Sequence, residues 1–162
     1  VPDTFHARLL SSGKTYTYRI LNSRHGSALL RRFWWHVPVP LAHEPMLRAV
    51  RTLEGTHDFA AFQAAGGTAK STLRTSLSLD GDQIVFRVSG NAFLYNMVRI
   101  MAGTLVEIGL GRLAPDAFSR AYASLSRLDL GMTAPPHGLE LTEVRYPPEA
   151  FLAPEPWYTP EK

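Results

Sequence analysis

The sequence predicts an α+β fold in which helices pack on one face of a mainly antiparallel sheet. Apolar and polar residues alternate over residues 14–21, 72–79, 83–90 and 139–147, as they do in half-buried strands. Apolar residues recur every three or four positions over residues 43–55, 92–110 and 116–128, as they do in amphipathic helices. Asp80 and Gly81 lie between the second and third strands, which indicates an antiparallel hairpin.

The N-terminal half supplies the first strand, a helix and the hairpin. Tyr16 and Tyr18 lie two residues apart on the first strand and therefore share one face of the sheet. We expect a short strand within residues 31–40, where prolines end it, and then an amphipathic helix that ends at Gly55. Residues 57–71 are rich in small side chains and glycine and are expected to form a mobile loop.

The C-terminal half is expected to contain two helices and a last strand. Asn91 is expected to cap the long helix at residues 92–110, and Gly111 to follow its end. We expect one domain over residues 1–148, followed by a loosely attached, proline-rich tail at residues 149–162.

Composition excludes several classes of site. The 162 residues include no cysteine, which rules out disulfides and thiolate metal sites and fits a reducing compartment such as the cytoplasm. The 6 histidines are not closely paired, so we expect no metal site. No apolar run reaches the roughly 20 residues that span a bilayer, so we expect a soluble protein without membrane contact.

Arginine carries most of the positive charge. The net charge is +3, and 14 of the 17 basic residues are arginine. This bias suits a nucleic-acid surface, because arginine binds phosphate through two hydrogen bonds, although a high-GC genome produces the same bias. Trp34 and Trp35 follow two arginines and are candidates for stacking on RNA bases, but we expect at least one of them to pack internally. The candidate phosphate contacts are His6, Arg8, Arg24, His25, Arg31, Arg32, Lys70 and Arg74.

Arg99 lies in an otherwise apolar stretch of the predicted long helix. Its neighbours one turn away are Tyr95, Asn96, Ala102 and Gly103, none of which is acidic. A surface arginine would extend into solvent, whereas a desolvated guanidinium needs a carboxylate or phosphate partner. We interpret this helix face as the wall of a cleft, with the anion supplied from elsewhere.

Six motifs follow one another along the chain. They are FHAR (5–8), KTYTYRI (14–20), DFAAF (58–62), KSTLRT (70–75), NAFLYNMVRIMAGTLVEIGLG (91–111) and APPHGLELTEVRYP (134–147). Together they resemble the C-terminal part of the TruA-type tRNA pseudouridine synthases. The resemblance implies a pseudouridine-synthase-like domain and an enzyme that isomerises uridine at positions 38–40 of the tRNA anticodon stem-loop. It also implies a homodimer that needs no cofactor or metal.

The resemblance assigns roles to individual residues. Tyr16 matches the active-site tyrosine that stacks on the target base, and Arg99 matches the arginine that pairs with the catalytic aspartate. Leu139 matches the apolar residue that lines the uracil pocket. Besides Leu139, the residues expected to bind the substrate are Asn96, Arg8 and His6.

One essential part of the family pattern is missing. The family's nucleophilic aspartate lies in a Gly-Arg-Thr-Asp motif, which does not occur in the 162 residues, and the first residue is Val1 rather than methionine. We therefore expect a piece of a longer protein that lacks the N-terminal half and is inactive alone. Two alternatives stay open: a non-catalytic RNA-binding module that retains the base pocket, and a structural domain in which Arg99 pairs with Glu140 or Glu143.

Overall fold

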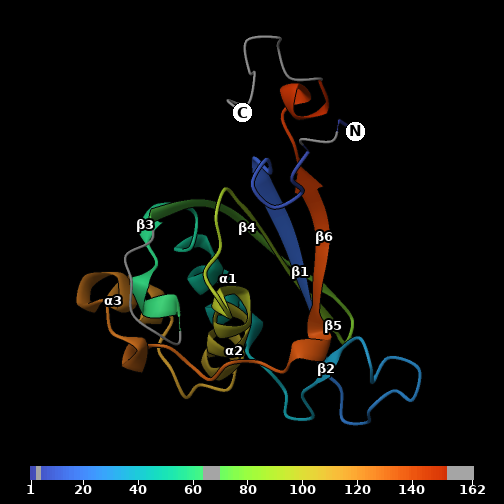
Figure 1. Ribbon diagram of the computed structural model, residues 1–162. Coiled ribbons are helices and arrows are strands. Elements are labelled where there is room, and N and C mark those ends of the chain that lie inside the picture. The colour runs from blue at the N-terminus through green and yellow to red at the C-terminus, as the bar shows by residue number, and fades with distance from the viewer. Residues whose placement is uncertain (3–4, 64–69, 153–162) are drawn as a thin grey trace.

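A six-stranded sheet organises the part of the chain that the computed structural model describes, which is residues 1–2, 5–63 and 70–152. The strands are β1 (Gly13–Leu21), β2 (Trp35–His36), β3 (Gly55–Asp58), β4 (Lys70–Asp80), β5 (Gln83–Gly90) and β6 (Leu139–Arg145). Their order is β2-β1-β5-β4-β3, and β6 also pairs with β1 (Figure 1). Among the described strand pairs only β1 with β2 is parallel, so the predicted mainly antiparallel sheet is confirmed.

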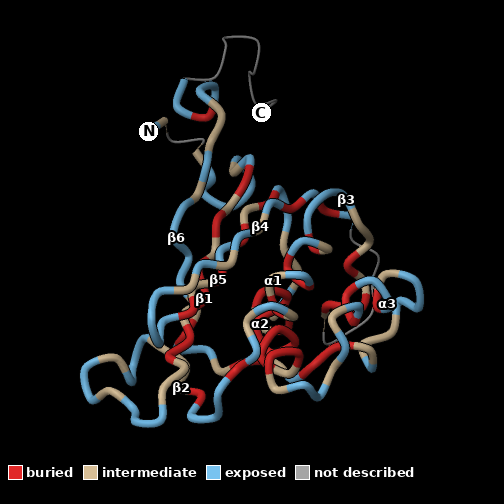
Figure 2. Tube along the Cα trace, turned by 180° about the vertical axis from the view of Figure 1, so that it is seen from behind, coloured by how far each residue is buried: buried red, intermediate tan, exposed pale blue. Residues whose placement is uncertain are grey.

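Helices cover one face of this sheet. They are α1 (His43–Arg51), α2 (Met97–Gly109) and α3 (Ala117–Ser124), and α1 and α2 lie side by side against the strands (Figure 1). Tyr18, Ile20 and Phe86 of the sheet are completely buried in one cluster with residues of α1 and α2, so the core lies between the two layers. Figure 2 shows α1, α2 and the strands beside them as largely buried. The predicted α+β fold with helices on one face is confirmed. Within the described residues, no helix is long and apolar enough to cross a membrane.

The segment predicted as a mobile loop contains regular structure in its described part. β3 pairs antiparallel with β4, and a 3₁₀ turn follows at Ala60–Phe62. Phe59 and Phe62 are completely buried and lie edge to face with their ring centroids 5.2 Å apart. These two aromatic anchors hold a segment whose small residues suggested mobility, so the prediction is wrong for this part. Residues 64–69 of the segment lie outside the described residues.

The long helix α2 begins at Met97, later than predicted, and Asn91 does not cap it. The Asn91 side-chain oxygen instead accepts a hydrogen bond from the backbone N–H of Thr72, at 2.9 Å. Asn96 precedes the helix in the left-handed region, with φ of 61°, a conformation that asparagine tolerates better than most residues. Residues 91–96 therefore form an irregular segment between the hairpin and α2.

An irregular segment, residues 130–138, crosses α2, ends in a 3₁₀ turn at Pro136–Gly138 and is called the strap below. A Cβ atom at Gly103 would lie 1.8 Å from the backbone oxygen of Met132, so only glycine lets the strap approach this closely. The backbone N–H of Gly131 donates to Oγ1 of Thr104 at 2.9 Å. Gly103 therefore faces the strap and Ala102 is completely buried, so the prediction that these two residues line a cleft is wrong.

Candidate active site

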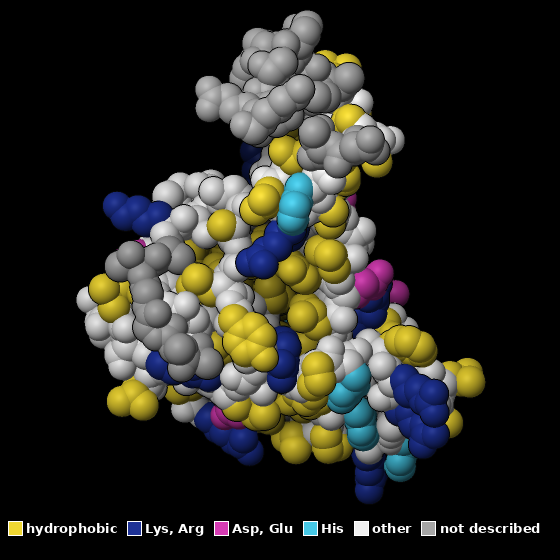
Figure 3. Space-filling view, in the orientation of Figure 1, with side chains coloured by type: hydrophobic (Ala, Val, Ile, Leu, Met, Phe, Trp, Pro, Cys, Tyr) yellow, Lys and Arg dark blue, Asp and Glu magenta, His cyan; other side chains and the backbone are white. Residues whose placement is uncertain are grey.

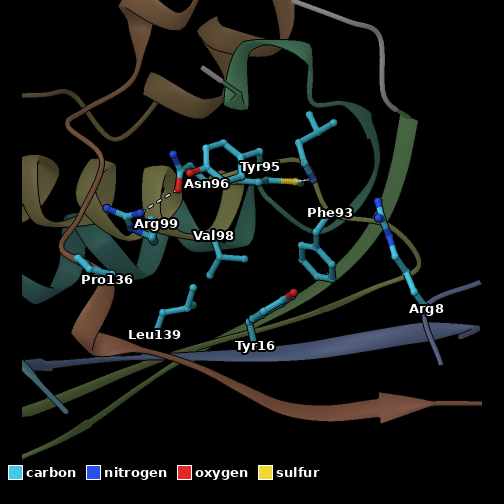
Figure 4. A pocket seen from close by; sticks show the side chains of 11 residues that line it. Arg8, Tyr16, Phe93, Tyr95, Asn96, Val98, Arg99, Pro136 and Leu139 are labelled. Carbon is cyan, nitrogen blue, oxygen red and sulfur yellow. Dashed lines mark hydrogen bonds between the residues drawn. The ribbon is translucent and has the colours of Figure 1, made fainter. Parts of the chain in front are cut away.

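A cavity of about 490 Å³ lies between the start of α2 and the strands β1 and β6. Figure 3 shows it as an apolar hollow near the centre of this face, with basic side chains at its margins. Five residues predicted for the site line it: Arg8, Tyr16, Asn96, Arg99 and Leu139 (Figure 4). The sixth, His6, is exposed and does not line the cavity, and its Nδ1 accepts hydrogen bonds from the backbone N–H groups of the turn that follows it.

β1 places Tyr16 at the floor of this cavity. Tyr16 and Tyr18 share the helix-facing side of β1, but Tyr18 is completely buried whereas Tyr16 is half-buried at the cavity. The ring of Tyr16 meets Phe93 edge to face, with centroids 5.0 Å apart. The pairing of β6 with β1 shifts register between Thr15 and Tyr16, and such bulges often re-aim a side chain beside a functional site.

Two neutral acceptors hold the guanidinium of Arg99. Its Nε donates to the backbone oxygen of Ala134 at 2.7 Å. Its Nη1 donates to Oδ1 of Asn96 at 2.9 Å, as Figure 4 shows. Among the described residues, no carboxylate forms an ion pair with Arg99. Glu140 pairs with Arg19, and Glu143 pairs with Arg145 at 3.3 Å. The alternative in which Glu140 or Glu143 neutralises Arg99 is therefore wrong.

The strap fixes the orientation of Arg99. Besides accepting from the Arg99 side chain, Ala134 donates its own N–H to the backbone oxygen of Arg99 at 3.0 Å. The next residue, Pro135, accepts a hydrogen bond from the Tyr18 hydroxyl at 2.7 Å. Burial raises the pKa of Tyr18 above its usual range, and the positive charge of Arg99 opposes that rise only in part. Tyr18 therefore stays protonated and serves as a structural hydrogen-bond donor to the strap. Asn96, the other acceptor, orients Arg99 from the opposite side of the sequence.

Sequence reasoning missed part of the cavity wall. Phe93, Tyr95, Val98 and Pro136 line the cavity with the predicted residues (Figure 4). Tyr95 is 78% exposed at the rim, and its position one helical turn before Arg99 was the signal that the sequence offered. Pro136 carried no signal, since only the path of the strap brings it to the cavity.

The chain matches the family model described as tRNA pseudouridine synthase over residues 49–147. This range includes Arg99 with its two hydrogen-bond acceptors, Asn96 and Ala134. It also includes Leu139, at the start of β6. The chain belongs to this family.

Three similar members are each called tRNA pseudouridine synthase A. The chain is 45% identical over 146 residues to the protein of Acetivibrio thermocellus, covering 88% of this chain and 60% of that protein. It is 44% identical over 143 residues to the protein of Halalkalibacterium halodurans, covering 86% and 54%. It is 45% identical over 153 residues to the protein of Syntrophotalea carbinolica, covering 92% and 61%. The chain thus spans less than two thirds of the length of these pseudouridine synthases.

The predicted phosphate contacts of this family member fall into three places. Arg8 lies at the rim of the cavity, and Lys70 and Arg74 are exposed on β4. His6 is exposed two residues before Arg8 and does not line the cavity. The remaining four are exposed on the β1–β2 connection, residues 22–34, and they are Arg24, His25, Arg31 and Arg32. Among the described residues, no three histidine, aspartate or glutamate side chains gather as a metal site would require.

Arg8 is held at the cavity by residues from the other end of the chain. The Tyr146 hydroxyl donates to the backbone oxygen of Ala7 at 2.7 Å. The Phe5 ring centroid lies 5.1 Å from that of Tyr146 and 5.7 Å from that of Phe151. Phe5, Tyr146 and Phe151 form an aromatic clasp around the turn that carries Arg8.

For the full-length protein, and on the function proposed below, we expect Tyr146→Phe to weaken tRNA binding without changing kcat, because the ring stays in the clasp while the hydrogen bond to Ala7 is lost. One such bond contributes about 0.5–1.5 kcal/mol, so the Kd should rise by about twofold to tenfold. Fluorescence anisotropy with labelled tRNA measures this change. In an Arg8→Ala background the same substitution should have no further effect, and independent effects of the two would contradict the positioning role.

Proposed function

We propose that this cavity binds the target uridine of a tRNA and that the protein isomerises it to pseudouridine. The observation that carries the proposal is Arg99, which lies half-buried in an apolar cavity with neutral acceptors and no carboxylate partner among the described residues. A guanidinium in such a place requires an anion. Membership of the tRNA pseudouridine synthase family supports an aspartate in that role.

The lining residues suit a base that has left its helical stack. An enzyme that acts on a base must extrude it into a pocket, where aromatic and apolar side chains replace the stacking lost. Tyr16 provides the aromatic platform, and Val98 and Leu139 provide the apolar wall. Arg8, at the rim, is placed to contact the phosphates of the extruded nucleotide.

The aspartate acts as the nucleophile in the proposed reaction. An adjacent cation favours the charged form of a carboxyl group, so Arg99 keeps the aspartate ionised at neutral pH. The carboxylate attacks C1′ as the bond from C1′ to N1 of uracil breaks, the base turns, and C5 then bonds to C1′ and displaces the carboxylate. C5 then loses its proton and N1 gains one, so the reaction is an isomerisation that consumes no electrons. We propose that a segment outside residues 1–162 supplies this aspartate, because the Gly-Arg-Thr-Asp motif is absent from them.

We further propose that the substrate uridines are those at positions 38–40 of the anticodon stem-loop and that the protein acts as a homodimer in the cytoplasm. The test is to incubate the full-length protein with unmodified tRNA transcripts and to map pseudouridine by mass spectrometry. Pseudouridine at positions 38–40 supports the proposal. A protein that binds the same tRNA without forming pseudouridine would instead be an RNA-binding module.

We expect residues 1–162 alone to form no pseudouridine, because Tyr16, Arg99 and Leu139 can hold a base but cannot attack C1′. The measurement is the pseudouridine content of tRNA after incubation with the purified 162-residue chain. Addition of the aspartate-containing segment as a separate chain should restore part of the activity. Conversion by the 162 residues alone would show that the nucleophile lies within them.

A further inference from the structure

A second cavity adjoins the candidate active site. It has a volume of about 440 Å³, and Leu139, at the start of β6, lines both cavities. Phe33 and Trp34 line it from the β1–β2 connection, and His137 and Glu140 line it from the strap and β6. The proposed uridine site therefore has a neighbouring hollow with two aromatic residues in its wall.

Local structure fixes the position of Trp34. Its backbone N–H donates to the backbone oxygen of Leu30 at 2.9 Å, within a turn that the Ser27 hydroxyl caps. The next residue, Trp35, lies in β2 and meets Tyr18 edge to face at 6.2 Å, so Trp35 is the tryptophan that packs internally, as predicted. Trp34 is half-buried at the cavity, and Phe33 beside it is 65% exposed. A large apolar ring that exposed has no evident structural purpose here.

The charges around this cavity suit an anionic, aromatic ligand. The guanidinium of Arg19 lies over the Trp34 ring, 6.0 Å from its centroid, and pairs with Glu140, so the one carboxylate of the cavity wall is neutralised. Arg31 and Arg32 are exposed just before the two aromatic residues, and residues 22–34 include no acid. Figure 3 shows basic side chains gathered over this connection, at the lower right of the view. Aromatic rings interleaved with cations are the usual surface for unpaired nucleotides.

We propose that the second cavity is a stacking site for an unpaired nucleotide of the same RNA strand that places its uridine in the first cavity. The base stacks on Phe33 and Trp34, and Arg31 and Arg32 contact the phosphates beside it. This proposal rests on the proposed function, since it takes RNA as the ligand. It adds a second point of recognition, which selects uridines by the presence of a neighbouring base that is free to leave its stack.

The test uses the full-length protein and a set of anticodon stem-loop RNAs, each with one loop base replaced by an abasic site. Phe33→Ala should raise the Kd for the intact RNA by about fivefold or more, the effect of losing one base–aromatic stack. One abasic RNA should bind the unaltered protein more weakly by a similar factor. That RNA should bind the Phe33→Ala variant with no further loss, because both changes remove the same stack. Phe33→Trp should retain the affinity.

Leu29→Ala is the matched control, since Leu29 is 87% exposed on the same connection and does not line the cavity. It should leave the Kd unchanged. Equal RNA affinity of the Phe33→Ala variant and the unaltered protein, or additive losses with every abasic RNA, would overturn the stacking site. Neither result would affect the proposed function, which fails separately if the unaltered full-length protein forms no pseudouridine.

Discussion

Arg99→Ala is expected to abolish nearly all pseudouridine formation by the full-length protein while tRNA binding falls much less. Removal of one member of a buried ion pair typically costs about 3–5 kcal/mol, because the other charge stays buried without a partner. Here that cost falls on the proposed aspartate nucleophile, so kcat should fall at least about 100-fold. Single-turnover kinetics, with the enzyme in excess of the tRNA and above the Kd, measure this loss separately from binding.

The pH dependence of the variant provides a second readout. In the proposed reaction, Arg99 lowers the pKa of the aspartate nucleophile, whose ionised form is the reactive one. Loss of the cation raises that pKa, so residual activity should be lowest at acidic pH and should recover as the pH rises. The acidic limb of the profile of kcat against pH should therefore move to higher pH. An unchanged limb would mean that Arg99 does not contact the nucleophile.

Two controls separate this role from a general effect of charge. Arg48→Ala removes an exposed arginine on α1 that pairs with Glu44 at 3.7 Å, and it should leave kcat unchanged. Arg99→Lys keeps the charge but loses the paired hydrogen bonds to Asn96 and Ala134, so its kcat should be intermediate. Equal losses of binding and of kcat in Arg99→Ala would instead make Arg99 a phosphate contact.

The fold was largely predictable because its strands and helices are amphipathic over long stretches. β1, β4 and β5 alternate as half-buried strands should, and their inward residues are the ones that α1 and α2 cover. The start of α2 was not predictable from periodicity. Apolar residues already occur at 92–95, but Asn96 has a left-handed backbone and Asn91 bonds to the hairpin instead of the helix.

The candidate site was predictable only in its parts that lie on regular elements. The absence of a nearby acid in the sequence identified Arg99 as a residue in need of a partner. One of its hydrogen-bond acceptors is the backbone oxygen of Ala134, which lies 35 positions later in the strap, where the sequence has no periodic pattern. The glycine that admits this strap, Gly103, was mistaken for a cleft wall because the sequence does not show what packs on it. Backbone contacts between distant segments leave no pattern in either segment.

Tyr16→Ala is expected to lower kcat/KM for tRNA by about 5- to 150-fold, because stacking on an aromatic side chain contributes about 1–3 kcal/mol per base. Phe93 cannot replace Tyr16 as the platform, because the plane of the Phe93 ring is turned by 78° from that of Tyr16 and so does not offer a base the same face. Initial rates of pseudouridine formation at low tRNA concentration measure the loss. Thermal denaturation followed by circular dichroism should show a small change, because Tyr16 is only half-buried.

Tyr16→Phe distinguishes the ring from its hydroxyl. Among the described hydrogen bonds none involves the Tyr16 hydroxyl, so the variant should keep its fold and its packing on Phe93. If Tyr16 serves as a stacking platform, Tyr16→Phe should retain most of kcat/KM, since phenylalanine offers a base the same flat face. A loss in Tyr16→Phe as large as that in Tyr16→Ala would contradict this role. It would show that the Tyr16 hydroxyl takes part in the reaction, most simply by accepting the proton that leaves C5.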